Sequence, residues 1–202
     1  MTLRLTTKLK NRLQQPSLIM APGVVDAMNA RLVAEAGFEA IYMTGAGTTA
    51  ARLGMPDVGL LSVVEMADNA GRIADASGLP LISDADTGYG SPVNVFRTVS
   101  LFEKAGVVGI HIEDQNWPKR CGHLAGKTLI PADEMAAKIN AACDARKDSD
   151  FTIIARTDAL ALHGLNAALD RAKLYEEAGA DVIFVESPQT EEEISTIPKS
   201  LS

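Results

Sequence analysis

The sequence has little cysteine and no long apolar run, and each absence excludes a class of protein. Its two cysteines, Cys121 and Cys143, give no disulfide framework, which is typical of a reducing cytoplasm. No apolar stretch approaches the ~20 residues that cross a bilayer. The segment Met1–Leu18 carries basic residues but lacks the apolar region of a signal peptide. We therefore expect a cytoplasmic protein with no membrane partner.

An excess of positive charge is also absent. Lys and Arg number 19 against 26 Asp and Glu, the net charge is −7, and no basic run is interleaved with aromatic residues. Surfaces that bind nucleic acids are basic, so we expect no nucleic-acid partner. With 47% hydrophobic and 22% charged residues, the 202-residue chain is ordinary for a globular protein and can bury one core. It contains no linker or low-complexity tract, so we predict one domain over residues 1–202.

A weak internal repeat predicts the fold class. The segments 36–44, 105–113 and 178–186 each read as the end of a helix, a glycine and a buried strand. The strand stretches are continuously apolar rather than alternating, which is typical of a parallel sheet covered by helices. The repeated glycines are 69 and 73 residues apart with one further helix–strand junction between them, so one β–α unit takes about 35 residues. This strict alternation indicates an α/β architecture.

We predict a (β/α)8 TIM barrel in preference to an open doubly wound sheet. No G-x-G-x-x-G motif follows the first predicted strand, Leu18–Met20, so the signature of a dinucleotide-binding fold is missing. Counting that strand, the sequence predicts six strands, whereas a complete barrel takes roughly 250 residues. We therefore expect a barrel truncated after about six β–α units, in a fragment of a longer gene product.

The predicted strands stop at polar or charged residues. In parallel α/β folds the carboxyl ends of the strands share one face, where the active site lies. Asp84 and Asp86 leave one strand and Glu113 leaves the next, and such carboxylates are hard oxygen ligands that suit Mg²⁺. Asp57 either joins the outer shell of that metal or caps a helix. The alternative interpretation of these four acidic residues is that they cap helices or are solvated charges in loops.

A cysteine lies among basic residues in the longest irregular stretch, which runs from about Gln115 to Pro131. Lys119, Arg120 and His123 surround Cys121, a setting that favours the reactive thiolate and suits a nucleophile or a general acid–base group. The alternative is an exposed basic loop with an incidental cysteine. A long loop of this kind at a catalytic face is often a lid, and we predict one here.

Three further candidates lie at or near strand ends. Arg156 follows an apolar strand, where its planar fork suits a substrate carboxylate, and an ion pair with Asp158 or Glu186 is an equal alternative. His111 lies within a strand, where a hydrogen-bonded core histidine competes with a functional one. Residues 44–48, with the sequence Thr-Gly-Ala-Gly-Thr, follow the second strand, and their backbone N–H groups suit an anion or an enolate oxygen.

These motifs together resemble the isocitrate lyase and phosphoenolpyruvate mutase superfamily. The similarity extends from about Leu18 to the end of the chain, and its matching stretches are Tyr42–Gly47, Asp84–Gly90, His111–Gln115, Pro118–His123 and Ala155–Ala159. The Lys-Arg-Cys-Gly-His stretch resembles the carbon–carbon lyase branch, notably the 2-methylisocitrate lyases, because the phosphonate-forming mutases of the superfamily lack this cysteine.

The resemblance implies a Mg²⁺-dependent barrel, with Mn²⁺ as the alternative ion, that forms a homotetramer by swapping C-terminal helices. It implies that Asp84, Asp86 and Glu113 surround the metal and that Asp57 is linked to it through water. Cys121, on a mobile gating loop, is then the general acid or base. The other implied site residues are His123, Arg156 and Lys119 in catalysis, and Tyr42, Thr44, Gly45, Ala46, His111, Gly122 and Glu186 in binding a small carboxylate substrate.

The resemblance predicts a Mg²⁺-dependent lyase that cleaves a 2-hydroxy di- or tricarboxylate, such as 2-methylisocitrate, to an α-keto acid and a second carboxylate. One departure concerns the substrate: Thr44-Gly45-Ala46 stands where the family lyases usually carry Ser-Gly-Gly or Ser-Gly-Trp. The same variant resembles oxaloacetate hydrolases and relatives labelled carboxyvinyl-carboxyphosphonate phosphorylmutases, and those two reactions are the enzymatic alternatives. The non-enzymatic alternative is a truncated, inactive chain that binds only Mg²⁺ or a partner subunit.

Overall fold

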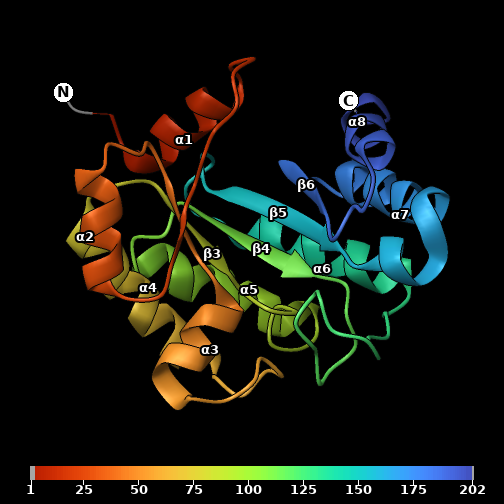
Figure 1. Ribbon diagram of the computed structural model, residues 1–202, viewed down its shortest axis with the longest axis horizontal. Coiled ribbons are helices and arrows are strands. Elements are labelled where there is room, and N and C mark those ends of the chain that lie inside the picture. The colour runs from red at the N-terminus through yellow and green to blue at the C-terminus, as the bar shows by residue number, and fades with distance from the viewer. Residues whose placement is uncertain (1–2, 202) are drawn as a thin grey trace.

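In the computed structural model, which describes residues 3–201, helices alternate with the strands of one parallel sheet (Figure 1). The described residues form six strands, which are β1 (Gly23–Val24), β2 (Ile41–Met43), β3 (Leu81–Asp84), β4 (Gly109–Glu113), β5 (Thr152–Thr157) and β6 (Val182–Val185). The helices in the same range are α1 (Leu5–Leu13), α2 (Ala27–Glu35), α3 (Gly45–Leu53), α4 (Val63–Ser77), α5 (Pro92–Lys104), α6 (Ala132–Ala145), α7 (Ala159–Glu177) and α8 (Glu191–Lys199). The predicted α/β class is confirmed.

The order of the strands in the sheet follows their order in the chain, from β1 to β6, and each neighbouring pair is parallel. Consecutive β–α units of a barrel wall have this order, whereas a doubly wound sheet reverses its strand order near the middle. The prediction of about six consecutive barrel units is therefore confirmed. Within residues 3–201, β1 and β6 are the two edges of the sheet.

The first strand lies later in the chain than predicted. Residues 18–20 are not in a strand, and Leu18 is 84% exposed. Pairing begins where the backbone N–H of Tyr42 donates to the carbonyl of Pro22 at 3.0 Å, and β1 follows at once. An apolar run predicts a strand only where a neighbouring strand is present to pair with it, and residues 18–20 precede that point.

The helix ends of the internal repeat have the predicted geometry. Helix α5 is followed by Ala105 and then by Gly106, whose φ of 83° lies in the left-handed region that suits glycine. The N–H groups of Gly106 and Val107 donate back to Glu103 and Phe102, which closes the helix and turns the chain into β4. The same conformation recurs after α2 and α7, at the two other glycines of the repeat.

The two faces of the sheet differ in chemistry, because successive strand residues point to opposite sides. In β4, Ile110 and Ile112 belong to the apolar core packed against the helices, together with such residues as Phe102 of α5 and Tyr175 of α7. The intervening residues of β4 are polar: His111 and Glu113, both essentially inaccessible to solvent. The sheet therefore places polar side chains on the side opposite the helices.

The irregular segment 115–131 follows β4 at the carboxyl end of the sheet (Figure 1). It contains no helix, and its two ends are joined by the bridge between Gln115 and Leu129 and by a hydrogen bond from Asn116 N to Thr128 O at 2.8 Å. The predicted long irregular stretch is confirmed, and its function as a lid stays a prediction. Within residues 3–201, none of the helices has the length and apolarity that a bilayer span requires.

Candidate active site

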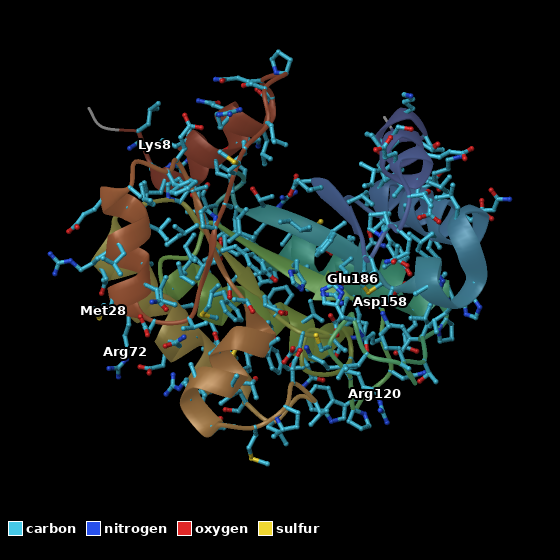
Figure 2. All side chains as sticks on the ribbon, in the orientation of Figure 1. Lys8, Met28, Arg72, Arg120, Asp158 and Glu186 are labelled. Carbon is cyan, nitrogen blue, oxygen red and sulfur yellow. The ribbon has the colours of Figure 1, made fainter. Side chains whose placement is uncertain are left out.

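A cavity of about 230 Å³ at the carboxyl end of the strands gathers ten of the fifteen predicted site residues. The predicted residues that line it are Tyr42, Thr44, Ala46, Asp57, Asp84, Cys121, Gly122, His123, Arg156 and Glu186. They come from β2, β3 and β5, from the start of α3 and from the loops after α3, β4 and β6, and Figure 2 shows Glu186 near the middle of the molecule. A larger cavity, about 660 Å³, lies beside Tyr89, Trp117 and Lys138 and contains none of the predicted residues. We place the site in the smaller cavity because the titratable groups converge there.

The other five predicted residues do not line the cavity, but each contacts a residue that does. Three of them, Gly45, Asp86 and His111, contact Asp84. Glu113 contacts Arg156, and Lys119 contacts Asp57. All fifteen therefore belong to one connected region.

Asp84, the last residue of β3, is held by three partners. Its two carboxylate oxygens accept from the backbone N–H groups of Gly45 at 3.1 Å and Asp86 at 2.8 Å, and His111 Nε2 lies 3.1 Å from Oδ1. Burial opposes ionisation of Asp84, but the nearby His111 and Lys119 outweigh that effect and hold its pKa well below the usual range. Asp84 is therefore a fixed, ionised carboxylate.

His111 connects Asp84 to Tyr42. The Tyr42 hydroxyl lies 3.0 Å from His111 Nδ1, and the two rings stack with centroids 5.7 Å apart. Burial, and next the charge of Asp84, raises the pKa of Tyr42, so its hydroxyl keeps its proton beside Nδ1. His111 was predicted to bind substrate, but it lies two residues before the end of β4 and is 1% exposed. It contacts the cavity through the lining residues Tyr42, Asp84 and Phe184. The alternative of a hydrogen-bonded core histidine describes its position.

The predicted anion-binding segment is the start of helix α3. Thr44 is the N-cap, and its hydroxyl accepts from Gly47 N at 2.9 Å. A Cβ at Gly45 would overlap the carboxylate of Asp84, so only glycine allows the helix to begin this close to β3. The partial positive charge of the helix N-terminus consequently faces Asp84 and the cavity.

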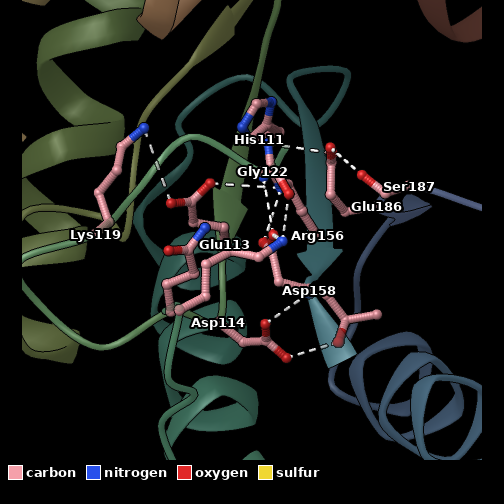
Figure 3. A network of polar contacts seen from close by, with 12 residues as sticks. His111, Glu113, Asp114, Lys119, Gly122, Arg156, Asp158, Glu186 and Ser187 are labelled. Carbon is pink, nitrogen blue, oxygen red and sulfur yellow. Dashed lines mark hydrogen bonds and ion pairs between the residues drawn. The ribbon is translucent and has the colours of Figure 1, made fainter. Parts of the chain in front are cut away.

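Lys119 lies among the predicted metal-binding carboxylates. Its Nζ is 2.7 Å from Asp57 Oδ2, 2.8 Å from Asp86 Oδ1 and 4.0 Å from Glu113 Oε1, and the residue is 2% exposed. Burial alone would lower the pKa of Lys119, but the surrounding carboxylates, Asp86 first, outweigh it and raise the pKa. The alternative of an exposed basic loop is therefore wrong for Lys119, whose ammonium group is a counter-charge among the predicted metal ligands. Figure 3 shows its contact with Glu113.

The region carries more buried negative than positive charge. Both carboxylate oxygens of Glu113 are buried without a hydrogen-bond partner, and burial raises its pKa. Burial, and next the charge of Asp84, raises the pKa of Asp86 to about 6. In all, six buried carboxylates face three buried cations: Asp57, Asp84, Asp86, Glu113, Asp158 and Glu186 against Lys119, Lys127 and Arg156. This region has too little positive charge to balance its acids.

These residues fit a hard divalent cation. Within residues 3–201, no group of three or more His, Cys, Asp or Glu side chains is arranged as a complete metal cage. Mg²⁺, however, often takes only one or two direct carboxylates and keeps several waters. The orphaned oxygens of Glu113 and the shortage of positive charge are features that such an ion satisfies.

Arg156 forms one of the ion pairs that the sequence offered as an alternative, and it also lines the cavity. Its guanidinium donates to Asp158 through Nε at 3.0 Å and Nη2 at 3.1 Å, so the alternative of an ion pair with Asp158 is confirmed. It also lies 3.4 Å from Glu186 and 5.4 Å from the centre of the Phe184 ring, and it lines the cavity. Figure 3 shows Arg156 between Glu113, Asp158 and Glu186. A charge so firmly held is a preorganised binding group for a carboxylate.

The cysteine segment lies over this charge network. Cys121 is half-buried, and its backbone N–H donates to the carbonyl of Asp57 at 3.2 Å. Gly122 is buried against Arg156 and Glu186. The side chain of His123 is 81% exposed, with Nε2 4.0 Å from Glu186, so the exposed-loop alternative describes His123 in this structure.

Sequence reasoning missed three residues of this region. Asp158 and Phe184 belong to it, and both carried a signal, since Asp158 follows Arg156 at a strand end and Phe184 precedes Glu186 by two positions. Lys127 also belongs to it, because its Nζ lies 2.8 Å from Asp158 Oδ1. No sequence signal marked Lys127, because its partners lie 5 and 31 residues away in the chain.

Fold and site together define an α/β-barrel-type protein with an acidic cavity at the carboxyl end of its strands. The chain belongs to the phosphoenolpyruvate phosphomutase family, whose model matches residues 9–202, within the isocitrate lyase/PEP mutase superfamily that the sequence resembles.

Known relatives carry several activities. The chain is 50% identical over 194 residues to 2,3-dimethylmalate lyase of Eubacterium barkeri. The matched region covers 96% of this chain and 67% of the relative. The crystal structure of a 2,3-dimethylmalate lyase superposes with a TM-score of 0.95 at 43% identity, over 100% of this chain and 68% of that one. The structure of oxaloacetate acetylhydrolase in complex with the inhibitor 3,3-difluorooxalacetate superposes equally well, with a TM-score of 0.95 at 44% identity. The superposition covers 98% of this chain and 69% of that one. The chain spans 56% to 60% of the next curated relatives.

Proposed function

We propose that this chain carries the catalytic face of a Mg²⁺-dependent carbon–carbon lyase that cleaves a 2-hydroxy di- or tricarboxylate to an α-keto acid and a second carboxylate. One observation carries the proposal: Cys121, Arg156 and Asp84 line one cavity, and the other carboxylates of the predicted metal site lie directly beside it. The similarity to 2,3-dimethylmalate lyase supports the same reaction class. Because of the likeness to that relative, 2,3-dimethylmalate is a candidate substrate in addition to 2-methylisocitrate.

The predicted metal would be held by Asp84, Asp86 and Glu113, with Asp57 in its outer shell. A divalent cation bound there supplies positive charge where oxygen charge develops during cleavage. Asp84 is suited to this position because His111, Gly45 and Asp86 fix its carboxylate. Lys119 balances part of the remaining charge through Asp57 and Asp86.

The cavity walls provide complementary groups for such a substrate. Arg156 presents a fixed guanidinium to a carboxylate. Tyr42 lines the cavity, and its hydroxyl, which can both donate and accept, is suited to a hydrogen bond with the substrate hydroxyl. Thr44 and Ala46 line the cavity at the start of α3, where the helix N-terminus favours a negatively charged oxygen.

The proposed reaction is a retro-aldol cleavage. A base removes the hydroxyl proton, the C2–O bond becomes a carbonyl, and the C2–C3 bond breaks with its electron pair leaving on C3. The thiol of Cys121 gives a proton to C3, so that an α-keto acid and a saturated carboxylate are formed. Cys121 is half-buried at the cavity wall, where a proton donor for C3 has to lie.

Hydrolysis of oxaloacetate is the second candidate, and the likeness to oxaloacetate acetylhydrolase is the observation that favours it. Water would attack the C2 carbonyl, and the same C2–C3 bond would break. The phosphorylmutase-like alternative is disfavoured by the resemblance, because the phosphonate-forming mutases lack the cysteine found here at Cys121.

A substrate panel separates these reactions by their products. We would incubate the full-length gene product and this chain with 2,3-dimethylmalate, 2-methylisocitrate, oxaloacetate and a carboxyphosphonate, with Mg²⁺ or Mn²⁺. Pyruvate from either hydroxy acid supports the lyase, oxalate from oxaloacetate supports the hydrolase, and a phosphonate product supports the mutase. Absence of all products from the full-length protein would refute the enzymatic proposal.

We also propose, from the resemblance alone, that the full-length gene product is a homotetramer. Size-exclusion chromatography with light scattering measures its mass directly. A monomeric full-length protein at micromolar concentration would contradict this proposal.

A further inference from the structure

Lys127 is a buried cation that the proposed reaction does not use. Its side chain is 3% exposed, and Nζ donates to Asp158 Oδ1 at 2.8 Å and to the carbonyl oxygen of Gly122. A buried ammonium group is retained only where its partners compensate for the lost hydration, and here both partners belong to the region of the cavity.

The loop between these two residues has buried ends and an exposed middle. Gly122 and Lys127 are buried, whereas residues 123–126 are all exposed. The bond from Lys127 Nζ to Gly122 O therefore closes a short surface excursion onto itself. The bond to Asp158 then fastens the closed loop to the residue that follows β5.

The fastening controls where the cysteine segment lies. Gly122 packs so closely on Arg156 and Glu186 that a Cβ at this position would overlap both side chains. Its neighbour Cys121 lines the same cavity. The carboxylate oxygen of Asp158 that accepts from Lys127 also accepts from Arg156 Nη2 at 3.1 Å, so one oxygen atom connects the loop to the proposed substrate-binding arginine.

The loop has open space on both of its sides. On one side is the cavity of the candidate site, and on the other is a cavity of about 480 Å³ that residues 122–127 form with Ala161, Leu162, Ser187 and Gln189. Apolar packing therefore fixes the excursion only weakly. The contact of Lys127 with Gly122 holds the excursion closed, and its contact with Asp158 joins the excursion to the end of β5.

We propose that Lys127 is a positioning residue that holds Cys121 and Gly122 over Arg156 by joining the loop to Asp158. It acts through the backbone of Gly122 and does not touch the substrate. The proposal concerns loop position in the ligand-free protein, so it stands or falls independently of the lyase reaction.

The test is the alkylation rate of Cys121 by iodoacetamide, measured by peptide mass spectrometry without substrate. Cys143, on α6, is the internal reference, because its thiol donates to Gly179 O away from the loop. In Lys127→Met we expect the ratio of the Cys121 rate to the Cys143 rate to rise about tenfold, since loss of two charge-assisted bonds releases the loop. Lys127→Arg, which keeps the charge, is expected to restore at least part of the slow rate.

Three results would overturn the proposal. The first is an unchanged ratio in Lys127→Met. The second is an equal acceleration of both cysteines, because that reports general loosening of the fold rather than release of the loop. The third is an equal rise in the control Lys173→Met, which removes an exposed lysine from α7.

Discussion

Cys121 lies half-buried at the wall of a cavity whose other polar groups are largely paired with one another. In Cys121→Ser we expect turnover to fall by a factor of about 10² to 10⁴, because the hydroxyl of serine is a much weaker acid than a thiol. Steady-state kinetics on whichever substrate the panel identifies measures this change. Stabilisation by Mg²⁺ should be kept, because Cys121 contacts the proposed metal site only through its backbone. Cys143→Ser is the control, and unchanged turnover in Cys121→Ser would remove this thiol from the mechanism.

Asp86 gives a prediction about pH and stability. Its pKa in the folded protein is about 6, chiefly because of burial, whereas the unfolded value is about 3.9. Between these two values the unfolded chain loses a proton that the folded chain keeps, so the contribution of Asp86 to stability falls as the pH rises.

The variant Asp86→Asn removes this titration. In metal-free protein we expect it to be more stable than the parent by about 1–3 kcal/mol above pH 6, and the difference to vanish below about pH 4. Urea unfolding at several pH values measures both. Asp75→Asn, an exposed change on α4, should show no such trend. A difference that grows toward acid pH would contradict the sign of the argument.

At the scale of elements, Asp114 joins β4 to β5 and α7. This fully buried carboxylate accepts from Thr157 Oγ1, Asp158 N, Arg171 Nη1 and Tyr175 OH, at 2.7 to 3.0 Å. Figure 3 shows it beneath Asp158. It therefore fixes the end of β4 relative to the elements that carry Arg156 and Asp158.

Replacement of Asp114 by Asn keeps the shape but removes the charge that four donors share. We expect a loss of about 2–4 kcal/mol in the free energy of unfolding, because a buried network is left incomplete. For a chain of this size the melting temperature should fall by about 5–15 °C. Asp68→Asn is the matched control, since it weakens only surface ion pairs, with Arg72 and Arg52, and should cost less than about 0.5 kcal/mol. Equal melting temperatures for the two variants would show that Asp114 does not anchor these elements.

The sequence predicts most of the elements because their signals are local. Apolar runs followed by Asp84, Glu113 or Arg156 mark the strand ends, and the glycines after α2, α5 and α7 mark helix ends. The predicted strand at residues 18–20 failed because the register of a strand depends on its neighbour, which hydropathy does not report. The path of segment 115–131 was not predictable either, since no periodicity governs an irregular loop.

The sequence predicts that the candidate site residues lie close together, but it does not predict most of the contacts between them. The convergence of Asp84, Cys121 and Arg156 follows from strand order, because parallel strand ends share one face. The position of Lys119 between Asp57 and Asp86 depends on how a long side chain folds back from the loop, over 33 and 62 residues of sequence separation. Only tertiary structure could therefore show that a lysine lies inside the predicted metal site.

For the whole molecule, the charge imbalance of the cavity predicts how stability responds to a divalent cation. Six buried carboxylates outnumber three buried cations, so keeping Asp86 and Glu113 in this site costs stability, and a cation that binds only the folded state would offset that cost. At Mg²⁺ concentrations of 100 times the dissociation constant the gain is about 2.7 kcal/mol, which corresponds to a rise of about 5–10 °C in melting temperature.

Melting curves of the chain in EDTA and in a series of Mg²⁺ concentrations measure this rise, and Ca²⁺ serves as the comparison for ion size. Glu113→Gln should remove most of the Mg²⁺-dependent part, because the carboxylate of Glu113 has no other hydrogen-bond partner. The same variant should melt higher than the parent in EDTA, because burial raises the pKa of Glu113 and glutamine avoids the cost of neutralising a carboxylate on folding. If Glu113 had only a structural role, the replacement would not raise the melting temperature in EDTA and at the same time reduce the rise caused by Mg²⁺. An equal response of both proteins to Mg²⁺ would mean that the ion binds elsewhere, and that Lys119, Lys127 and Arg156 are the cations that offset the buried carboxylates.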